Sequence, residues 1–560
     1  MSALPEADFD RDAGFPRLAD EQLAALAAAG ERRSAEAGST LFRAGDPAYD
    51  FFAVVSGSVA IVGDAGSPTE YVIGIHRERG FSGEIGLVTG EPAYVDAVVQ
   101  EPSELIALSR EQLQQVVAND QQLGDLILSA YMARRAMLIG RGAGLRLIGS
   151  HLSPDTRRLR EFLTRNRIPH SFLDVEADEQ ADGLLRGLGV APAETPIVLH
   201  GSRVLRRPSN LALAAELQLR SARSPDEVCD TVVVGAGPAG LGAAVYAASE
   251  GLATVLVDSV ATGGQASTSS RIENYLGFPA GVSGSELAER AAVQAARFGV
   301  RIAVPESATT LSLDDGYHAI ALTSGERVRA RSVVLATGAS YRRLPLARLH
   351  EFEGAGVYYA ATQVEAQACS GEAVVVVGAG NSAGQAAIFL AGNSCAVDMV
   401  VRGTALEATM SRYLVDQIQA TPGITLRCRT EVRELHGSDR LEALTLTHNR
   451  TGDENRVSAR ALFVFIGADP CTGWLEDQLV VDEHGFLVTG QELQLTHLDP
   501  AGDGRDRPPL PLETSRPGVF AVGDVRAGSI KRVASAVGEG AMAVRLIHQY
   551  LASLAGPAVS

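Results

Sequence analysis

Two glycine-rich segments have the residue types and spacing that allow a backbone to bind a dinucleotide. The first, Gly235-Ala-Gly-Pro-Ala-Gly240, follows the apolar strand-like run TVVV and precedes an alanine-rich stretch. Gly235 permits a tight turn, Gly237 lets a pyrophosphate approach the backbone, and Gly240 permits close packing of a helix on a strand. The phosphates then lie at a helix N-terminus, where free N–H groups and the helix dipole favour negative charge. Asp258 ends the next predicted strand, about 20 residues further on, where an acceptor for a ribose 2′-hydroxyl is expected.

The second segment, Gly378-Ala-Gly-Asn-Ser-Ala383, repeats this strand–loop–helix pattern, so the C-terminal part contains a duplicated dinucleotide-binding unit. Its second strand ends in Arg402 and not in a carboxylate. An acidic side chain there repels a 2′-phosphate, whereas an arginine pairs with it. The sequence therefore predicts NADPH in preference to NADH. Arg412 is either a second phosphate contact or a solvated helix residue.

Composition limits the other possibilities. The chain has 560 residues and a net charge of −18, which argues against nucleic acid or an anionic membrane as a partner. No apolar run approaches the roughly 20 residues that span a bilayer, and the N-terminus lacks the apolar core of a signal peptide, so we expect a cytoplasmic protein. No two of the five cysteines are separated by two residues, and we predict neither a CxxC motif nor a metal site.

Hydrophobic periodicity divides the chain into an α/β multidomain protein. Alternating strands followed by one helix over 110–138 predict a β-roll at 20–140, and a βαβαβ-type order predicts a small α/β domain at 145–220. The polar segments 221–227 and 497–510 read as a linker and an exposed insertion.

Residues 228–560 resemble low-molecular-weight thioredoxin reductases and related flavoproteins. The resemblance rests on GAGPAG (235–240), TGGQ (262–265), RIENYLGFP (271–279), VVLATGA (333–339), VVVVGAGNSAGQAA (374–387), FVFIGADP (463–470) and GVFAVGDVR…KRVASAVGEGA (518–541). It implies an FAD-binding domain at 228–342 and 468–560, interrupted by an NAD(P)H-binding domain at 343–467. The implied FAD-binding residues are Gly235, Gly237, Gly240, Asp258, Gly264, Gln265, Asn274, Thr337, Gly338, Gly523, Asp524, Arg532 and Ala534. The implied NADPH-binding residues are Gly378, Gly380, Asn381, Ser382, Ala383 and Arg402. Such a module usually forms a homodimer, which we expect here as well.

The chain departs from this family at the redox-active cysteine pair. The tetrad in the corresponding position is Ala360-Ala361-Thr362-Gln363, whose side chains cannot carry out disulfide exchange. Cys369 lies nearby, but a buried packing role is the commoner fate of a lone cysteine. We therefore expect the reduced flavin itself to serve an acceptor that the sequence leaves open: an external disulfide, a ferredoxin or flavoprotein, a quinone or oxygen.

The small α/β domain resembles glutaredoxins and thioredoxins. Thr195-Pro196 precedes a strand in the manner of that family's cis-proline, which faces the redox motif. The motif position reads Ser153-Pro154-Asp155-Thr156, so both thiols are absent and we expect a structural or docking module.

The first domain resembles cyclic nucleotide-binding domains over 42–62 and 81–99, with Gly83 and Glu84 as the implied phosphate and ribose contacts. The arginine of that family is replaced by Ala93, with Tyr94 next to it. Loss of this charge-assisted partner argues against binding of cAMP or cGMP.

These features lead to one principal hypothesis, an NADPH-dependent FAD oxidoreductase. Two alternatives stay open: a regulatory flavoprotein that senses redox state with little turnover, and a thioredoxin-disulfide reductase that uses non-standard cysteines.

Overall fold

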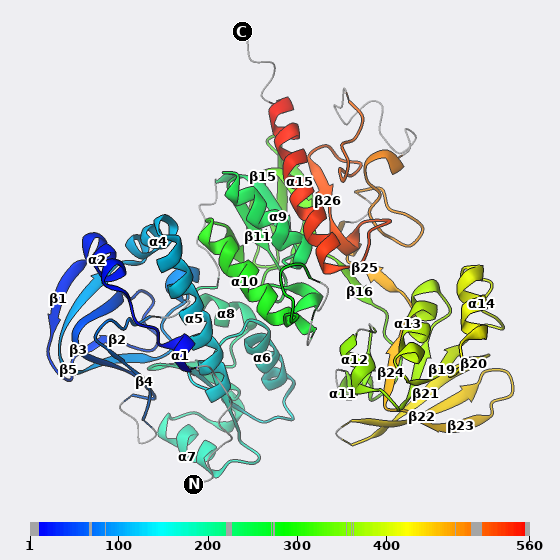
Figure 1. Ribbon diagram of the computed structural model, residues 1–560, viewed down its shortest axis with the longest axis horizontal. Coiled ribbons are helices and arrows are strands. Elements are labelled where there is room, and N and C mark those ends of the chain that lie inside the picture. Colours follow the sequence, from blue (N-terminus) through cyan, green and yellow to red (C-terminus); the bar gives the residue numbers. More distant parts are fainter. Residues whose placement is uncertain are drawn as a thin grey trace.

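The computed structural model describes residues 11–65, 70–83, 86–219, 227–269, 272, 275–353, 356–359, 361, 363–438, 440–475, 478–493 and 507–554. Figure 1 shows a central unit built on the strands β10, β11 and β15, with the N-terminal half on one side of it and the unit that contains β18–β24 on the other. Among these residues no helix has both the length and the apolar content to cross a membrane, and no group of His, Cys, Asp and Glu is arranged to hold a metal ion.

The N-terminal unit is an antiparallel roll covered by helices. Its sheet has the order β1-β5-β3-β4, with β2 paired to β5. The strands are β1 (Glu31–Ala35), β2 (Thr40–Phe42), β3 (Phe51–Gly63), β4 (Tyr71–Arg77) and β5 (Asp96–Leu108). The helices are α1 (Arg11–Gly14), α2 (Asp20–Ala29), α3 (Gly86–Thr89), α4 (Arg110–Asn119) and α5 (Gln121–Arg141).

The single helix predicted over 110–138 is two helices, α4 and α5. Asp120 separates them because its backbone is extended and its side chain accepts a hydrogen bond from the Leu123 N–H at 3.0 Å, as an N-cap does. Tyr131 of α5 packs edge-on against Phe81, so the second helix closes the roll.

The middle unit has a four-stranded sheet in the order β7-β6-β8-β9. Strand β7 (His170–Asp174) is parallel to β6 (Leu145–Gly149), whereas β8 (Ile197–His200) is antiparallel to β6 and β9 (Arg203–Arg206) is antiparallel to β8. The helices are α6 (Pro154–Arg165), α7 (Glu179–Gly187) and α8 (Asn210–Glu216), with a 3-10 turn η1 (Pro192–Glu194). The Thr195–Pro196 peptide bond is cis, which confirms that expectation.

The central unit is a seven-stranded sheet in the order β12-β11-β10-β15-β14-β13, with β26 paired to β15. The strands β10, β11, β12, β15 and β26 are parallel to one another, whereas β15 is antiparallel to β14 and β14 to β13. Valines and leucines from the parallel strands fill the core between the sheet and the helices α9 and α15. The strands are β10 (Val228–Val234), β11 (Thr254–Val257), β12 (Arg301–Ala303), β13 (Ala308–Asp314), β14 (Tyr317–Leu322), β15 (Arg327–Leu335) and β26 (Val519–Ala521). The helices are α9 (Pro238–Ser249), α10 (Gly284–Arg297) and α15 (Val533–Leu554), with the 3-10 turns η2 (Gly264–Thr268), η3 (Gly473–Leu475), η4 (Gly490–Glu492) and η6 (Gly523–Val525).

A two-stranded ribbon, β16 (Ala339–Tyr341) and β25 (Ala468–Pro470), leads from the central unit to the unit that contains 343–467. That unit has a five-stranded parallel sheet in the order β17-β24-β18-β19-β20, covered on one face by the three-stranded sheet β21-β22-β23 and on the other by helices. The strands are β17 (Val357–Tyr358), β18 (Ala373–Val377), β19 (Ala396–Val401), β20 (Ile424–Cys428), β21 (Thr430–Gly437), β22 (Leu441–His448), β23 (Glu454–Ser458) and β24 (Ala461–Val464). The helices are α11 (Leu349–Phe352), α12 (Gln363–Ala368), α13 (Asn381–Gly392) and α14 (Arg412–Ala420).

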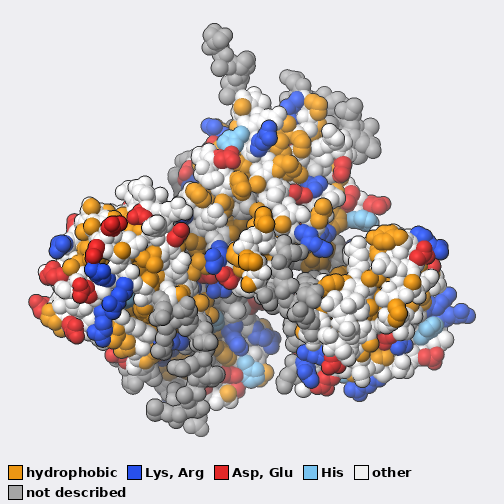
Figure 2. All heavy atoms as spheres, in the orientation of Figure 1, with side chains coloured by type: hydrophobic (Ala, Val, Ile, Leu, Met, Phe, Trp, Pro, Cys, Tyr) orange, Lys and Arg blue, Asp and Glu red, His pale blue; other side chains and the backbone are white. Residues whose placement is uncertain are grey.

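The surface carries mixed charge. On the face shown in Figure 2, acidic and basic side chains are interspersed over the units on both sides. That face therefore presents no continuous basic surface of the kind that binds nucleic acid.

Candidate dinucleotide sites

The first loop needs its outer glycines for the fold itself. Gly235 has a φ of 105°, and a Cβ on it would lie 2.2 Å from the Ala336 carbonyl oxygen. A Cβ on Gly240 would lie 1.8 Å from the Gly235 carbonyl oxygen. Both positions are closed to any side chain by the close approach of β10, β15 and α9.

The second loop has the same requirement at its first position. Gly378 has a φ of 146°, and a Cβ on it would lie 2.3 Å from the Phe465 carbonyl oxygen and 2.9 Å from the Ala383 Cβ. Ala383 is fully buried in α13, where its methyl group fits against the loop. Ala383, which stands where the first loop has Gly240, therefore packs into the second loop without disturbing it.

The middle glycines differ, because nothing in the fold excludes a side chain there. A Cβ on Gly237 would approach only the Gly264 Cα, at 3.9 Å, and a Cβ on Gly380 would meet no atom within 4 Å. Both residues have negative φ and are the N-caps of α9 and α13, so open space lies directly in front of each helix N-terminus. A dinucleotide phosphate at that point accounts for a glycine that the fold leaves unconstrained. The residues present thus fit one dinucleotide on each sheet.

Asp258 holds the first loop in shape. Its carboxylate accepts hydrogen bonds from the N–H groups of Ala236 at 2.7 Å, Val260 at 2.9 Å and Ala261 at 3.2 Å. Burial raises the pKa of Asp258, and these amides act against that shift. Each carboxylate oxygen has a further lone pair, so a ribose hydroxyl can still donate to it.

Two other predicted FAD segments meet the first loop. A Cβ on Gly264 would lie 2.9 Å from the Gly237 Cα, and the Gln265 side chain donates to the Ala339 carbonyl oxygen. Thr337 donates through Oγ1 to the Cys471 carbonyl oxygen at 2.9 Å, and the Gly338 carbonyl oxygen accepts from the Cys471 N–H at 3.0 Å. The structure therefore brings 235–240, 264–265 and 337–338 to one edge of the central sheet.

The C-terminal segment reaches the same region through Asp524, which lies in the 3-10 turn η6 that precedes α15. Burial raises the pKa of Asp524, and the Lys531 ammonium donates to its backbone carbonyl oxygen at 3.2 Å. Gly523 donates its N–H to Glu539 at 2.7 Å. Arg532 and Ala534 are exposed at the start of α15, and Asn274 lies outside the described residues.

Tyr341 is a residue of this region that the sequence reasoning missed. Its side chain is 37% exposed, and partial desolvation raises the pKa of its hydroxyl, Asp524 raises it further and Arg532 lowers it. It therefore lies near both predicted FAD residues, on the ribbon strand β16. The only sequence signal was its place two residues after the VVLATGA motif.

The second site has an arginine, Arg402, whose charge can bind a phosphate at the position that the sequence predicted. The Arg402 side chain is exposed, and no carboxylate in the described part of the chain pairs with it. Arg412 instead forms an ion pair with Asp416, 2.9 Å away on the same helix. Asn381 accepts a hydrogen bond from the Ser411 N–H at 2.8 Å, and Ser382 is exposed beside it. Arg402 is thus the better placed of the two arginines to meet a 2′-phosphate.

Cys369 has the environment of a packing residue. It is 2% exposed, burial raises the pKa of its thiol to about 11, and its carbonyl oxygen accepts from the Cys395 thiol at 3.2 Å. A thiol in this state is protonated at neutral pH and inaccessible, so the geometry gives no support to Cys369 as a redox residue. In the tetrad, Ala360 and Thr362 lie outside the described residues, and Gln363 begins α12.

The segment of the roll around Ala93 and Tyr94 packs against the middle unit. Tyr94 is buried in the core of the middle unit beside Leu145 and Leu159, and the Ala93 carbonyl oxygen accepts from His200 Nε2 at 3.3 Å. Inside the roll, Arg134 donates to the Gly83 carbonyl oxygen at 2.8 Å. Glu84 lies outside the described residues.

A small cavity in the roll lies beside Phe15, His76 and Arg134 and measures about 20 Å³. That is room for about one water molecule.

Comparisons with known proteins agree with this division. The model of the pyridine nucleotide-disulphide oxidoreductase family matches residues 229–540, and the model of the cyclic nucleotide-binding domain matches residues 32–120. The thioredoxin reductase of Treponema pallidum (strain Nichols) is 34% identical over 331 residues, which cover 58% of this chain and 98% of that protein. The thioredoxin reductase of Streptomyces clavuligerus is 31% identical over 335 residues, 59% of this chain and 96% of that protein. The solved thioredoxin reductase of Streptococcus pyogenes MGAS5005 is 29% identical, with 58% of this chain and 99% of that chain covered and a TM-score of 0.49.

Proposed function

Because the chain belongs to the pyridine nucleotide-disulphide oxidoreductase family, we propose that it oxidises NADPH through a bound FAD and passes the electrons to an acceptor outside its own sequence. The observation that carries this proposal is the pair of middle glycines, Gly237 and Gly380. Each faces open space at a helix N-terminus, although no contact among the described residues requires a glycine there.

The cofactors divide between the two sheets. In this proposal FAD lies on the central sheet and is held by Asp258, Gln265 and Asp524, together with the other predicted FAD residues. NADPH lies on the β18 sheet at α13, where Arg402 meets its 2′-phosphate. When bound, the nicotinamide supplies a hydride and the flavin accepts it.

We propose that the acceptor receives its electrons from the flavin without a cysteine of this chain. The reasons are the absence of a CxxC sequence and the burial of Cys369 with a raised thiol pKa. An external disulfide, a ferredoxin or flavoprotein, a quinone and oxygen are all compatible with this scheme.

The N-terminal half serves, in this proposal, as a docking element. The β7-β6-β8-β9 order and the cis-Pro196 support a thioredoxin-like fold for 145–220. Gly149 separates Thr156 from Pro196, since a Cβ on it would lie 2.6 Å from Thr156 Oγ1 and 2.9 Å from Pro196 Cβ. Thr156, in the tetrad 153–156 that resembles the redox motif, therefore lies near the cis-proline but has no thiol. Ala93 in place of the arginine of cyclic nucleotide-binding domains supports a roll that does not bind cAMP or cGMP.

Anaerobic titration of the purified protein tests the function directly. We expect bound flavin, bleaching of its visible absorption by NADPH at lower concentration than by NADH, and rapid reoxidation by one acceptor of a panel. A preparation without flavin, or a flavin that NADPH does not bleach, would contradict the proposal. Uniformly slow reoxidation with every acceptor would favour the regulatory flavoprotein instead.

A further inference from the structure

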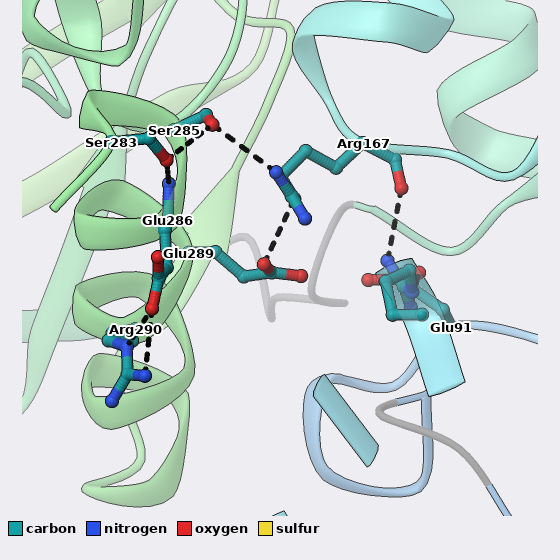
Figure 3. A network of polar contacts seen from close by, with 8 residues as sticks. Glu91, Arg167, Ser283, Ser285, Glu286, Glu289 and Arg290 are labelled. Carbon is teal, nitrogen blue, oxygen red and sulfur yellow. Dashed lines mark hydrogen bonds and ion pairs between the residues drawn. The ribbon is translucent and has the colours of Figure 1, made fainter. Parts of the chain in front are cut away.

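A partly buried ion pair joins the middle unit to the central unit. Arg167, two residues beyond the end of α6, places its Nε 2.9 Å from Glu289 Oε2 on α10 and donates through Nη1 to Ser285 Oγ at 3.4 Å. The side chains of Arg167 and Glu289 are 28% and 10% exposed. Figure 3 shows Arg167 reaching across to Ser285 and Glu289, which lie on one face of the same helix.

The preceding residue holds a second segment of the central unit. Asn166 donates through Nδ2 to the Val260 carbonyl oxygen at 3.1 Å. Val260 lies two residues after Asp258, at the entry to the 263–264 glycine turn. Asn166 and Arg167 therefore contact the chain on one side of this turn and α10 on the other.

Helix α10 in turn packs so closely against the Gly263–Gly264 turn that no side chain fits at Gly263. A Cβ on Gly263 would lie 2.4 Å from the Ala288 Cβ, and Ala288 is the residue before Glu289. Gly263 donates its N–H to the Ala236 carbonyl oxygen at 2.7 Å, inside the first dinucleotide loop. Tightly packed interiors transmit displacements, so the position of α10 sets the position of this turn beside Gly237.

The same network continues into the roll. Arg135 of α5 pairs with Glu91 at 2.6 Å, with side chains 3% and 11% exposed, and its Nη1 lies 3.5 Å from the Arg167 carbonyl oxygen. Burial raises the pKa of Glu289, and Arg167 and Arg135 counteract that shift. Two ion pairs, Arg135–Glu91 and Arg167–Glu289, are thus connected across three units by the contact of Arg135 with the Arg167 carbonyl oxygen.

We propose that Arg167 is a positioning residue for the FAD site, through which the N-terminal half controls how tightly the flavin is bound. Docked on Glu289, it fixes α10 against the Gly263–Gly264 turn, which lines the pyrophosphate position. The proposal rests on the FAD-binding function proposed above. It gives the N-terminal half a role at the flavin that needs neither a thiol nor a cyclic nucleotide.

The test compares Arg167→Ala with Arg290→Ala, its matched control. Arg290 lies on α10 and makes an exposed pair with Glu286 at 2.8 Å. We expect Arg167→Ala to raise the Kd of the apoprotein for FAD by roughly 3- to 30-fold, the range typical of coupled positions, and to alter the visible spectrum of the bound flavin. Arg290→Ala is expected to match the wild type in both measurements.

Two further variants distinguish loss of the ion pair from a general loss of folding. Arg167→Lys is expected to recover part of the affinity, and the exchange Arg167→Glu/Glu289→Arg to recover more than either single change. A wild type that takes up no FAD would overturn the proposed function. A wild type that binds FAD, with Arg167→Ala indistinguishable from Arg290→Ala, would overturn this inference and leave the function intact. Should Arg167→Ala not fold, failure of the double exchange to bind better than its single variants would overturn the inference.

Discussion

The rings of Tyr341 and Tyr359 stack with their centroids 5.8 Å apart and their planes 10° from parallel. Tyr341 lies on the ribbon strand β16, and Tyr359 directly follows β17. The Tyr359 hydroxyl also donates to Glu353 at 2.7 Å. The stack therefore joins the ribbon to the unit that contains 343–467, directly before the tetrad 360–363.

Removing the Tyr359 ring is expected to speed reduction of the flavin by NADPH. We propose that hydride transfer involves a rotation of the unit that contains 343–467, as the resemblance to thioredoxin reductases implies, and an aromatic stack of about 0.5–1.5 kcal/mol opposes that rotation. Tyr359→Ala should therefore raise the reduction rate up to about tenfold in anaerobic stopped-flow measurements. Tyr359→Phe keeps the ring and should behave as the wild type; a slower Tyr359→Ala variant would show that the stack does not restrain the domain.

The middle glycines and the outer glycines should respond differently to alanine. Gly380→Ala adds a methyl group where no atom lies within 4 Å, so the Tm of the cofactor-free protein should stay unchanged while NADPH binding weakens. Gly240→Ala places its methyl group against the Gly235 carbonyl oxygen and should lower the Tm. Differential scanning calorimetry and NADPH titration measure the two effects. Equal NADPH affinity in Gly380→Ala and the wild type would place the nucleotide elsewhere.

Arg402 should determine the choice between the two nicotinamide cofactors. A charge-assisted contact to a phosphate contributes about 1.5–3 kcal/mol, so Arg402→Ala should raise the KM for NADPH by roughly 10- to 100-fold and leave that for NADH nearly unchanged. Arg412→Ala serves as the control, because Arg412 is already paired with Asp416. An equal loss with both cofactors would argue that Arg402 does not contact the 2′-phosphate.

Glu513 should make the central unit sensitive to acid. Burial by itself would raise its pKa, but the ion pair with Arg507 and the N–H groups of Gly518 and Leu510 hold the pKa of Glu513 below its ordinary value. Because the folded-state pKa is the lower one, this stabilisation is present above the unfolded-state value of about 4.3 and is lost as pH falls through the folded-state pKa.

The measurement for Glu513 is the urea midpoint of unfolding between about pH 5 and pH 3. The wild-type midpoint should fall across this range, and Glu513→Gln should start lower at pH 5 and fall less steeply. Parallel curves for the two proteins would show that other carboxylates dominate the acid response.

Much of the dinucleotide chemistry could be predicted from the sequence because it depends on short local patterns. The spacing of Gly235, Gly237 and Gly240 after a strand determines a turn, a helix start and a phosphate position without distant residues. The identity of Arg402 at a strand end is equally local. The prediction of a single helix over 110–138 was wrong in one detail. A capping interaction of Asp120 divides the segment into two helices although its hydrophobic periodicity is continuous.

The tertiary structure decided which distant residues share a site. The residue type of Cys369 indicated burial, but nothing in the sequence indicated its contact with Cys395 or the stack of Tyr341 with Tyr359. In the sequence, nothing distinguishes Arg167 and Glu289 from ordinary surface charges, because each belongs to a different unit and neither lies in a motif. Their pairing depends on how two folded surfaces meet. That is a property of shape and desolvation summed over many residues, whereas a glycine loop is fixed by the backbone geometry of a few consecutive ones.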